Sequence, residues 1–146
     1  MGIQKGKSAI AVGYGAMSEI IDTTIDGDVR AGDLQFDLHA YVGEIRDRFP
    51  DNSINRRSLV PGACFSTNMN FPGGMSGSPI FDDEGIYVHG IVSSSARDES
   101  GSGSIGYGTM VQEILTVPIE LLEGMTLLEA NRDARFGMPK MSIAGA

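Results

Sequence analysis

The amino-acid sequence predicts a mainly β protein, a six-stranded antiparallel β-barrel followed by short C-terminal helices. Six short segments of β-branched, aromatic or alternating residues are separated by turns rich in Gly, Pro, Asn and Asp. Six strands joined by tight turns are typical of a small closed barrel. The chain has 146 residues, which suits one domain. We expect the barrel over residues 1–112 and a helical segment with a tail over residues 113–146.

Each expected strand is bounded by turn residues. The strands are expected at Ser8–Tyr14, Leu34–Glu44, Leu59–Ser66, Pro79–Phe81, Ile86–Ser93 and Ile105–Val111. The second strand has the two-residue period of a half-buried strand. That period predicts an apolar face made of Leu34, Phe36, Leu38 and Ala40, and a polar face made of Gln35, Asp37, His39 and Tyr41. The turn at Asp82–Gly85 joins the fourth and fifth strands as a hairpin.

Polar segments connect and follow these strands. Residues 46–57 are charged and contain a Pro-Asp-Asn turn signal, so we expect an exposed loop there. Residues 94–104 are rich in Gly and Ser and are expected to be mobile. Residues 118–123 can form a helical turn. Thr126-Leu-Leu-Glu129 is the signature of a capping box, which predicts a short helix ending near Gly137.

Composition excludes several classes of function. The formal net charge is −8 and the pI is near 4.6, which argues against binding to the phosphate backbone of nucleic acids. No apolar run is long enough to cross a membrane. The chain has a single cysteine, Cys64, so it can form no intrachain disulfide. Cys64 lies in an apolar strand and is expected to be a small core residue. The sequence predicts no metal site and no cofactor.

The segment from Phe71 to Phe81 carries the strongest chemical signal. Glycines at positions 74 and 77 flank Ser76 and allow a tight turn whose amides point at one place. Converging amide N–H groups can stabilise a tetrahedral oxyanion, and a serine presented there can attack a carbonyl if a base removes its proton. The alternative is a plain Gly/Ser turn between strands. The nucleophile elbow of α/β-hydrolases does not fit, because Ser78 and Pro79 follow where that motif has glycine and a helix.

Three segments in order, Gly74–Pro79, Val88–Ser93 and Gly106–Val111, resemble the end of the trypsin-like (chymotrypsin-fold) serine peptidases. The resemblance implies that the chain is the second β-barrel of that fold. It implies Ser76 as nucleophile and the amides of Gly74 and Ser76 as the oxyanion hole. Other implied roles concern a peptide or protein substrate. Ser93, Ser94 and Ser95 would pair with its backbone as an added strand, and Asn70 would lie at the base of the primary specificity pocket, with Ser95 and Gly106 on its walls.

The sequence departs from that family in two ways. Met75 stands where many members have an aspartate that pairs with a new N-terminus. The histidine and aspartate of the family's mechanism come from a first barrel, for which the residues before Ser8 leave no room. His39 is expected to be an exposed strand residue and His89 a structural one, with His89 as a base for Ser76 as the alternative.

Three hypotheses therefore stand. The chain is the nucleophile-bearing half of a serine endopeptidase, inactive without its first barrel. It is instead a pseudo-peptidase or peptide-binding module, or a minimal hydrolase that uses His89. A lone barrel is expected to expose the apolar face that its partner barrel would cover, and hence to associate with a second copy.

Overall fold

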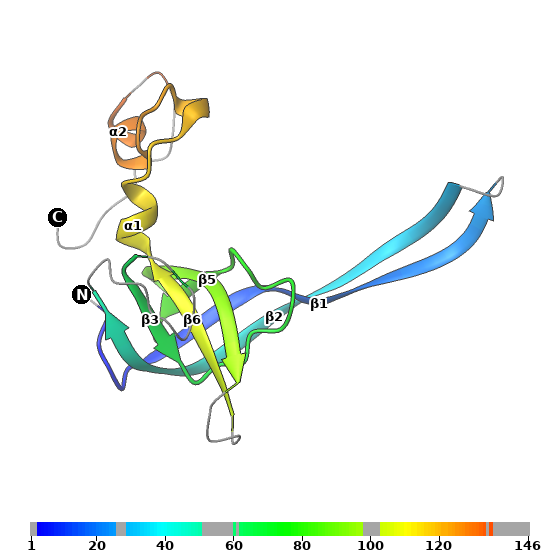
Figure 1. Ribbon diagram of the computed structural model, residues 1–146, viewed down its shortest axis with the longest axis horizontal. Coiled ribbons are helices and arrows are strands. Elements are labelled where there is room, and N and C mark those ends of the chain that lie inside the picture. Colours follow the sequence, from blue (N-terminus) through cyan, green and yellow to red (C-terminus); the bar gives the residue numbers. More distant parts are fainter. Residues whose placement is uncertain are drawn as a thin grey trace.

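The protein forms a closed six-stranded antiparallel barrel with two short α-helices, which confirms the predicted fold class (Figure 1). The computed structural model describes residues 3–25, 29–50, 60, 62–97, 103–133 and 135. The strands are β1 (Ser8–Ile25), β2 (Val29–Phe49), β3 (Cys64–Thr67), β4 (Pro79–Asp82), β5 (Val88–Arg97) and β6 (Ser104–Met110). They close in the order β1-β2-β3-β6-β5-β4. All six strand pairs are antiparallel.

Strands β1 and β2 are much longer than the sequence predicts. Their pairing runs from Ser8↔Glu44 inside the barrel to Ile25↔Val29, with irregularities after Gly15 and Ile21. Beyond the barrel the two strands continue as a two-stranded arm that projects away from it (Figure 1). Strand β2 also continues to Phe49, so the loop expected from residue 46 begins later. Residues 51–57 of that expected loop lie outside the described residues.

The predicted inward face of β2 is wrong where the structure describes it, because Leu38 and Ala40 of the predicted apolar face are both exposed. Leu38 is 63% exposed, whereas Tyr41 is half-buried and packs against the core. The pairing register explains the difference, because a shift by one residue moves every side chain of a strand to the other face. Tyr41 pairs with the fully buried Ala11 and therefore points inward with it. The side chains of Leu34, Gln35 and Phe36 lie outside the described part of the chain.

The barrel interior combines large and small buried side chains. Phe65 of β3 is fully buried, and its ring contacts Gly108 of the adjacent strand β6 and Gly90 of the next strand β5. A Cβ atom at Gly90 would lie 2.8 Å from its ring, and one at Gly108 would lie 2.7 Å from it. Small residues opposite a large one are what a small barrel needs to close without voids. The core residues include Ala9, Ala11, Ile45, Phe65, Met69, Phe71, Met75, Ile80 and Val92.

The boundaries of β3, β5 and β6 also differ from the prediction, since β3 starts at Cys64 instead of Leu59 and β5 starts at Val88 instead of Ile86. Strand β5 runs to Arg97 and so includes the first four residues of the segment 94–104 that was expected to be a mobile loop. Residues 98–102 of that segment lie outside the described residues. Strand β6 ends at Met110, and the helix α1 (Val111–Leu115) starts at once, where a strand was predicted to residue 111. The strand propensity of Val111 is overridden because the chain has reached the end of the barrel, where no further strand pairs with it.

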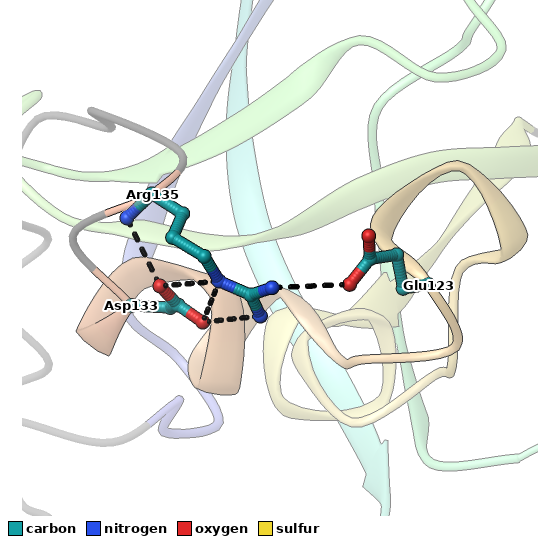
Figure 2. A network of polar contacts seen from close by, with 3 residues as sticks. All are labelled: Glu123, Asp133 and Arg135. Carbon is teal, nitrogen blue, oxygen red and sulfur yellow. Dashed lines mark hydrogen bonds and ion pairs between the residues drawn. The ribbon is translucent and has the colours of Figure 1, made fainter.

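The C-terminal segment contains η1 (Glu120–Leu122) and α2 (Leu127–Arg132). The predicted capping box is confirmed: the Glu129 amide donates to the Thr126 hydroxyl, and the Thr126 amide donates to the Glu129 carboxylate at 2.8 Å. The helix ends at Arg132, earlier than the expected end near Gly137, because Asp133 already has an extended backbone. Arg135 follows it and bonds to Asp133 at 2.7 Å and to Glu123 at 3.4 Å (Figure 2). None of the described helices is long and apolar enough to cross a membrane.

Candidate active site

Ser76 lies exposed on the loop that connects β3 to β4, in a double turn built by its neighbours. The Met75 amide donates to the Pro72 carbonyl at 3.3 Å, and the Ser78 amide donates to the Met75 carbonyl at 3.0 Å. Gly74 has φ of 97° and Gly77 has φ of 86°. Residues that carry a Cβ atom rarely adopt such φ angles. The backbone of this turn therefore requires glycine at both positions.

The loop is anchored to the barrel by Met75, whose side chain is completely buried in the core. It also lies directly against β1. A Cβ atom at Gly13 would lie 1.9 Å from Ser78 Oγ and 3.1 Å from Met75 Sδ. An apolar residue at position 75 therefore holds Ser76 in place by packing, where an aspartate would need a buried cationic partner.

A second attachment ties the loop to β5. The Gly77 amide donates to the Val92 carbonyl at 2.8 Å, and the Val92 amide donates to the Ser78 carbonyl at 2.8 Å. These two bonds place Ser76 beside the middle of β5, next to the residues that sequence resemblance assigns to substrate binding. Pairing between β4 and β5 starts at Pro79↔Ile91. On the side of β5 that faces β4, no strand in the described part of the chain pairs with β5 beyond Val92.

The amides of Gly74 and Ser76 are the two sequence-predicted oxyanion donors. Among the described residues, neither amide has a hydrogen-bond acceptor, although the intervening Met75 amide is bonded. A donor left without a protein acceptor on an exposed loop is available to a ligand. The backbone here thus presents two unbonded amides, those of Gly74 and Ser76, with the bonded Met75 amide between them.

Phe71 lies between Asn70 and the other two residues expected in the specificity pocket, Ser95 and Gly106. Its amide donates to Ser95 Oγ at 3.1 Å, and the Ser95 hydroxyl donates to its carbonyl at 3.0 Å. A Cβ atom at Gly106 would lie 2.4 Å from the Phe71 ring. The ring also stacks edge-on against Tyr41 at 6.5 Å. Ser95 and Gly106 are thus brought together around Phe71, which the sequence did not single out.

Asn70 is exposed and points to the other side of this segment. It lines an open hollow of about 410 Å³ together with His39, Tyr41 and Pro72. Neither Ser95 nor Gly106 is among the residues that line this hollow. Two further predicted contact residues lie on β5. Ser93 has its hydroxyl 2.6 Å from Thr109 Oγ1, so this hydroxyl faces the neighbouring strand β6, and Ser94 is half-buried and pairs with Tyr107 of β6.

His89 has surroundings of its own at the start of β5. It lines a separate pocket of about 120 Å³ with Lys7, Asp82 and Glu84, and Ser76 does not line that pocket. Burial lowers the pKa of His89, and the nearby charges of Asp82 and Asp83 partly oppose this. The loop of Ser76 meets β5 at Val92, about 10 Å along the strand. A direct proton transfer between Ser76 and His89 gains no support from this arrangement.

His39 lies nearer to the loop than the sequence suggested. It pairs with Gly13, the residue against which Ser78 packs. Its ring is exposed and lies 6.1 Å from that of Tyr41. The sequence contained no local signal for this proximity, because it depends on the pairing of β1 with β2.

Other chemistry is limited in the described part of the chain. Cys64 is fully buried, as expected, and burial raises the pKa of its thiol, which disfavours a reactive thiolate. The described residues contain no group of three or more His, Cys, Asp or Glu side chains that could hold a metal ion. The site is therefore one of a serine hydroxyl and backbone amides.

Comparison of the chain with protein-family models, with curated proteins and with solved structures found no match. The likeness to trypsin-like peptidases consequently rests on the three sequence segments, while the barrel and the geometry around Ser76 stand as independent observations.

Proposed function

We propose that this chain is the nucleophile-bearing barrel of a trypsin-like serine endopeptidase. The observation that carries the proposal is the exposed Ser76 with two unbonded amides at Gly74 and Ser76, held on a closed six-stranded barrel. Backbone donors fixed where negative charge develops are a major source of rate enhancement in acyl transfer, and each contributes about 3 kcal/mol.

In the proposed reaction, Ser76 Oγ forms a bond to the scissile carbonyl carbon while a general base takes the hydroxyl proton. The carbonyl oxygen becomes negative and accepts hydrogen bonds from the two amides. The C–N bond then breaks, the amine leaves with the proton, and an ester remains on Ser76. Water cleaves that ester by the same steps. The base would come from a first barrel.

The edge of β5 beyond Val92 on the side that faces β4, with which no described strand pairs, supports a role for this barrel in holding an extended peptide. Because no described strand pairs with that edge beyond Val92, a substrate can add there as a further strand. The same observation favours a second candidate function, a peptide-binding module that does not cleave. Neither His39 nor His89 forms a described hydrogen bond with Ser76, which agrees with either function for the isolated chain.

Chemical rescue can separate the two candidates. The purified chain is incubated with a fluorophosphonate probe in rising concentrations of imidazole, which serves as an added base. Imidazole takes the Ser76 proton as the Oγ–P bond forms and fluoride leaves. We expect imidazole-dependent labelling that is lost in Ser76→Ala and kept in the matched variant Ser78→Ala.

Absence of labelling at every imidazole concentration would contradict the peptidase proposal and favour peptide binding without cleavage. Labelling without imidazole would show that a base lies within the chain or its oligomer. His39→Ala and His89→Ala, compared side by side, would then show which histidine supplies it.

A further inference from the structure

The outer wall of the barrel carries an apolar row that crosses four strands in register. Val42 of β2 pairs with Ile10 of β1, Ile10 pairs with Phe81 of β4, and Phe81 pairs with Val88 of β5. Residues paired across a sheet project from the same face. Their inward neighbours Ala9, Ala11 and Ile80 are completely buried, so this row points outward.

Two further apolar pairs continue this face towards the arm. Val12 pairs with Ala40, and Tyr14 pairs with Leu38. Exposure is high at the edges of the face: Val42 is 71% exposed, Leu38 63% and Tyr14 48%. We call the eight residues the outer face: Ile10, Val12, Tyr14, Leu38, Ala40, Val42, Phe81 and Val88.

The size of the outer face exceeds what scattered surface residues explain. Val88 is 39% exposed and Ala40 is exposed as well, whereas Ile10, Val12 and Phe81 are half-buried. Together the eight side chains leave on the order of 500 Å² of surface, within the range of the largest apolar patch on a monomer. Each partner of a stable standard interface buries about 800 Å², so neighbouring side chains have to join the outer face in a stable dimer. Ile86 and Tyr87, which directly precede Val88 in the chain, are 62% and 42% exposed.

We infer that the outer face is the interface of a two-fold homodimer of this chain. Sheet faces pack on sheet faces at about 10 Å, and a two-fold axis uses the same patch on both copies. The central pair, Ala40 and Val12, includes the smallest residue of the face, with larger pairs on either side. A two-fold axis that lies in the interface plane and runs along this central pair exchanges the flanking pairs. Leu38 of each copy then meets Val42 of the other copy, on either side of the small central residue Ala40.

The oligomeric state tests the inference directly. Sedimentation velocity of the full chain from 5 to 200 μM is expected to show a concentration-dependent dimer. Val42→Asp places a charge on the most exposed position of the outer face and is expected to weaken the dimer at least tenfold. Leu121→Asp is the matched control, because Leu121 is 93% exposed on the C-terminal segment and lies outside the outer face.

A monomer at 200 μM overturns the inference, and so does an equal response of the two variants. Far-UV circular dichroism checks that each variant is folded, and Leu38→Lys replaces Val42→Asp if the latter does not fold. A dimer that survives Val42→Asp and Leu38→Lys places the contact elsewhere and also overturns it. The outcome is independent of the imidazole experiment, which reports on Ser76 alone.

Discussion

The hydroxyl of Ser95 holds the backbone of Phe71 at both ends, accepting from its amide at 3.1 Å and donating to its carbonyl at 3.0 Å. One side chain of β5 thereby replaces the strand partner that this part of the loop lacks. The segment that leads to Ser76 is fixed to the barrel by this pair, by the bonds at Val92 and by the buried Met75.

Removing the Ser95 hydroxyl is expected to destabilise the protein. Ser95→Ala leaves a partly buried amide and carbonyl of Phe71 without their partner, which costs about 1–3 kcal/mol. Urea unfolding measures the change in the free energy of unfolding. Ser76→Ala is the control, since Ser76 is exposed and forms no hydrogen bond with the described residues; a similar loss in both variants would refute the structural role of Ser95.

Gly106 is expected to tolerate no side chain. A Cβ atom there would lie 2.4 Å from the Phe71 ring and 2.7 Å from the Met69 carbonyl oxygen. Overpacking of this kind costs about 1–3 kcal/mol, which thermal and urea unfolding of Gly106→Ala will show. Gly73→Ala is the matched control because nothing lies within 4 Å of its Cβ position, and its effect should stay within about 0.5 kcal/mol.

Gly74→Ala tests the oxyanion arrangement. At φ of 97° an alanine is strained by about 1–3 kcal/mol, so the backbone will turn away and move its amide. We expect imidazole-dependent labelling of Ser76 to slow by about 10²-fold or more, while Gly73→Ala labels at the normal rate. Equal rates in the two variants would show that the Gly74 amide does not take part.

The stability of the β4–β5 hairpin is expected to depend on the charge of Asp82. Its carboxylate accepts the amides of Ile86 at 2.8 Å and Tyr87 at 3.2 Å. Burial tends to raise the pKa of Asp82, but these amide bonds and the nearby His89 together lower it below its ordinary value. A lowered pKa in the folded state means that the carboxylate stabilises the fold above about pH 4 and loses this effect as the pH falls further.

Unfolding of Asp82→Asn and the parent protein across pH 2–7 measures that dependence. The stability difference between them should be largest near neutral pH and shrink as the pH falls through the lowered pKa. Asp83→Asn, at an exposed neighbouring position, serves as control. A difference that grows towards low pH would contradict the proposed role of the amide bonds.

Cys64 is expected to react with thiol reagents only after unfolding. It is fully buried, and burial raises its pKa, so both access and thiolate fraction are low in the native state. Labelling by a chromogenic disulfide at pH 8 should be at least 10²-fold faster in denaturing urea than in buffer. Fast labelling of the native protein would show that the cluster of Cys64 with Val60 and Tyr107 opens readily.

The sequence alone was sufficient for the number of strands, the hairpin at Asp82–Gly85, the capping box at Thr126 and the glycine-flanked turn at Ser76. Each of these depends on neighbours within a few residues, because turn angles and helix caps are set by local sterics and local hydrogen bonds. The sequence did not predict the full length of β1 and β2. Residues that can end a strand, such as glycine, do not end it when a paired strand continues opposite them.

Tertiary structure decided which way the strands face. The period of two in β2 was visible in the sequence, but its phase was not, because the inward face is chosen by the register against Ala9 and Ala11 of the adjacent strand β1. The same closure brought Phe71 between Ser95 and Gly106, turned Asn70 towards His39, and separated His89 from Ser76. These relationships join residues far apart in the chain, and they are set by how six strands fill one narrow interior.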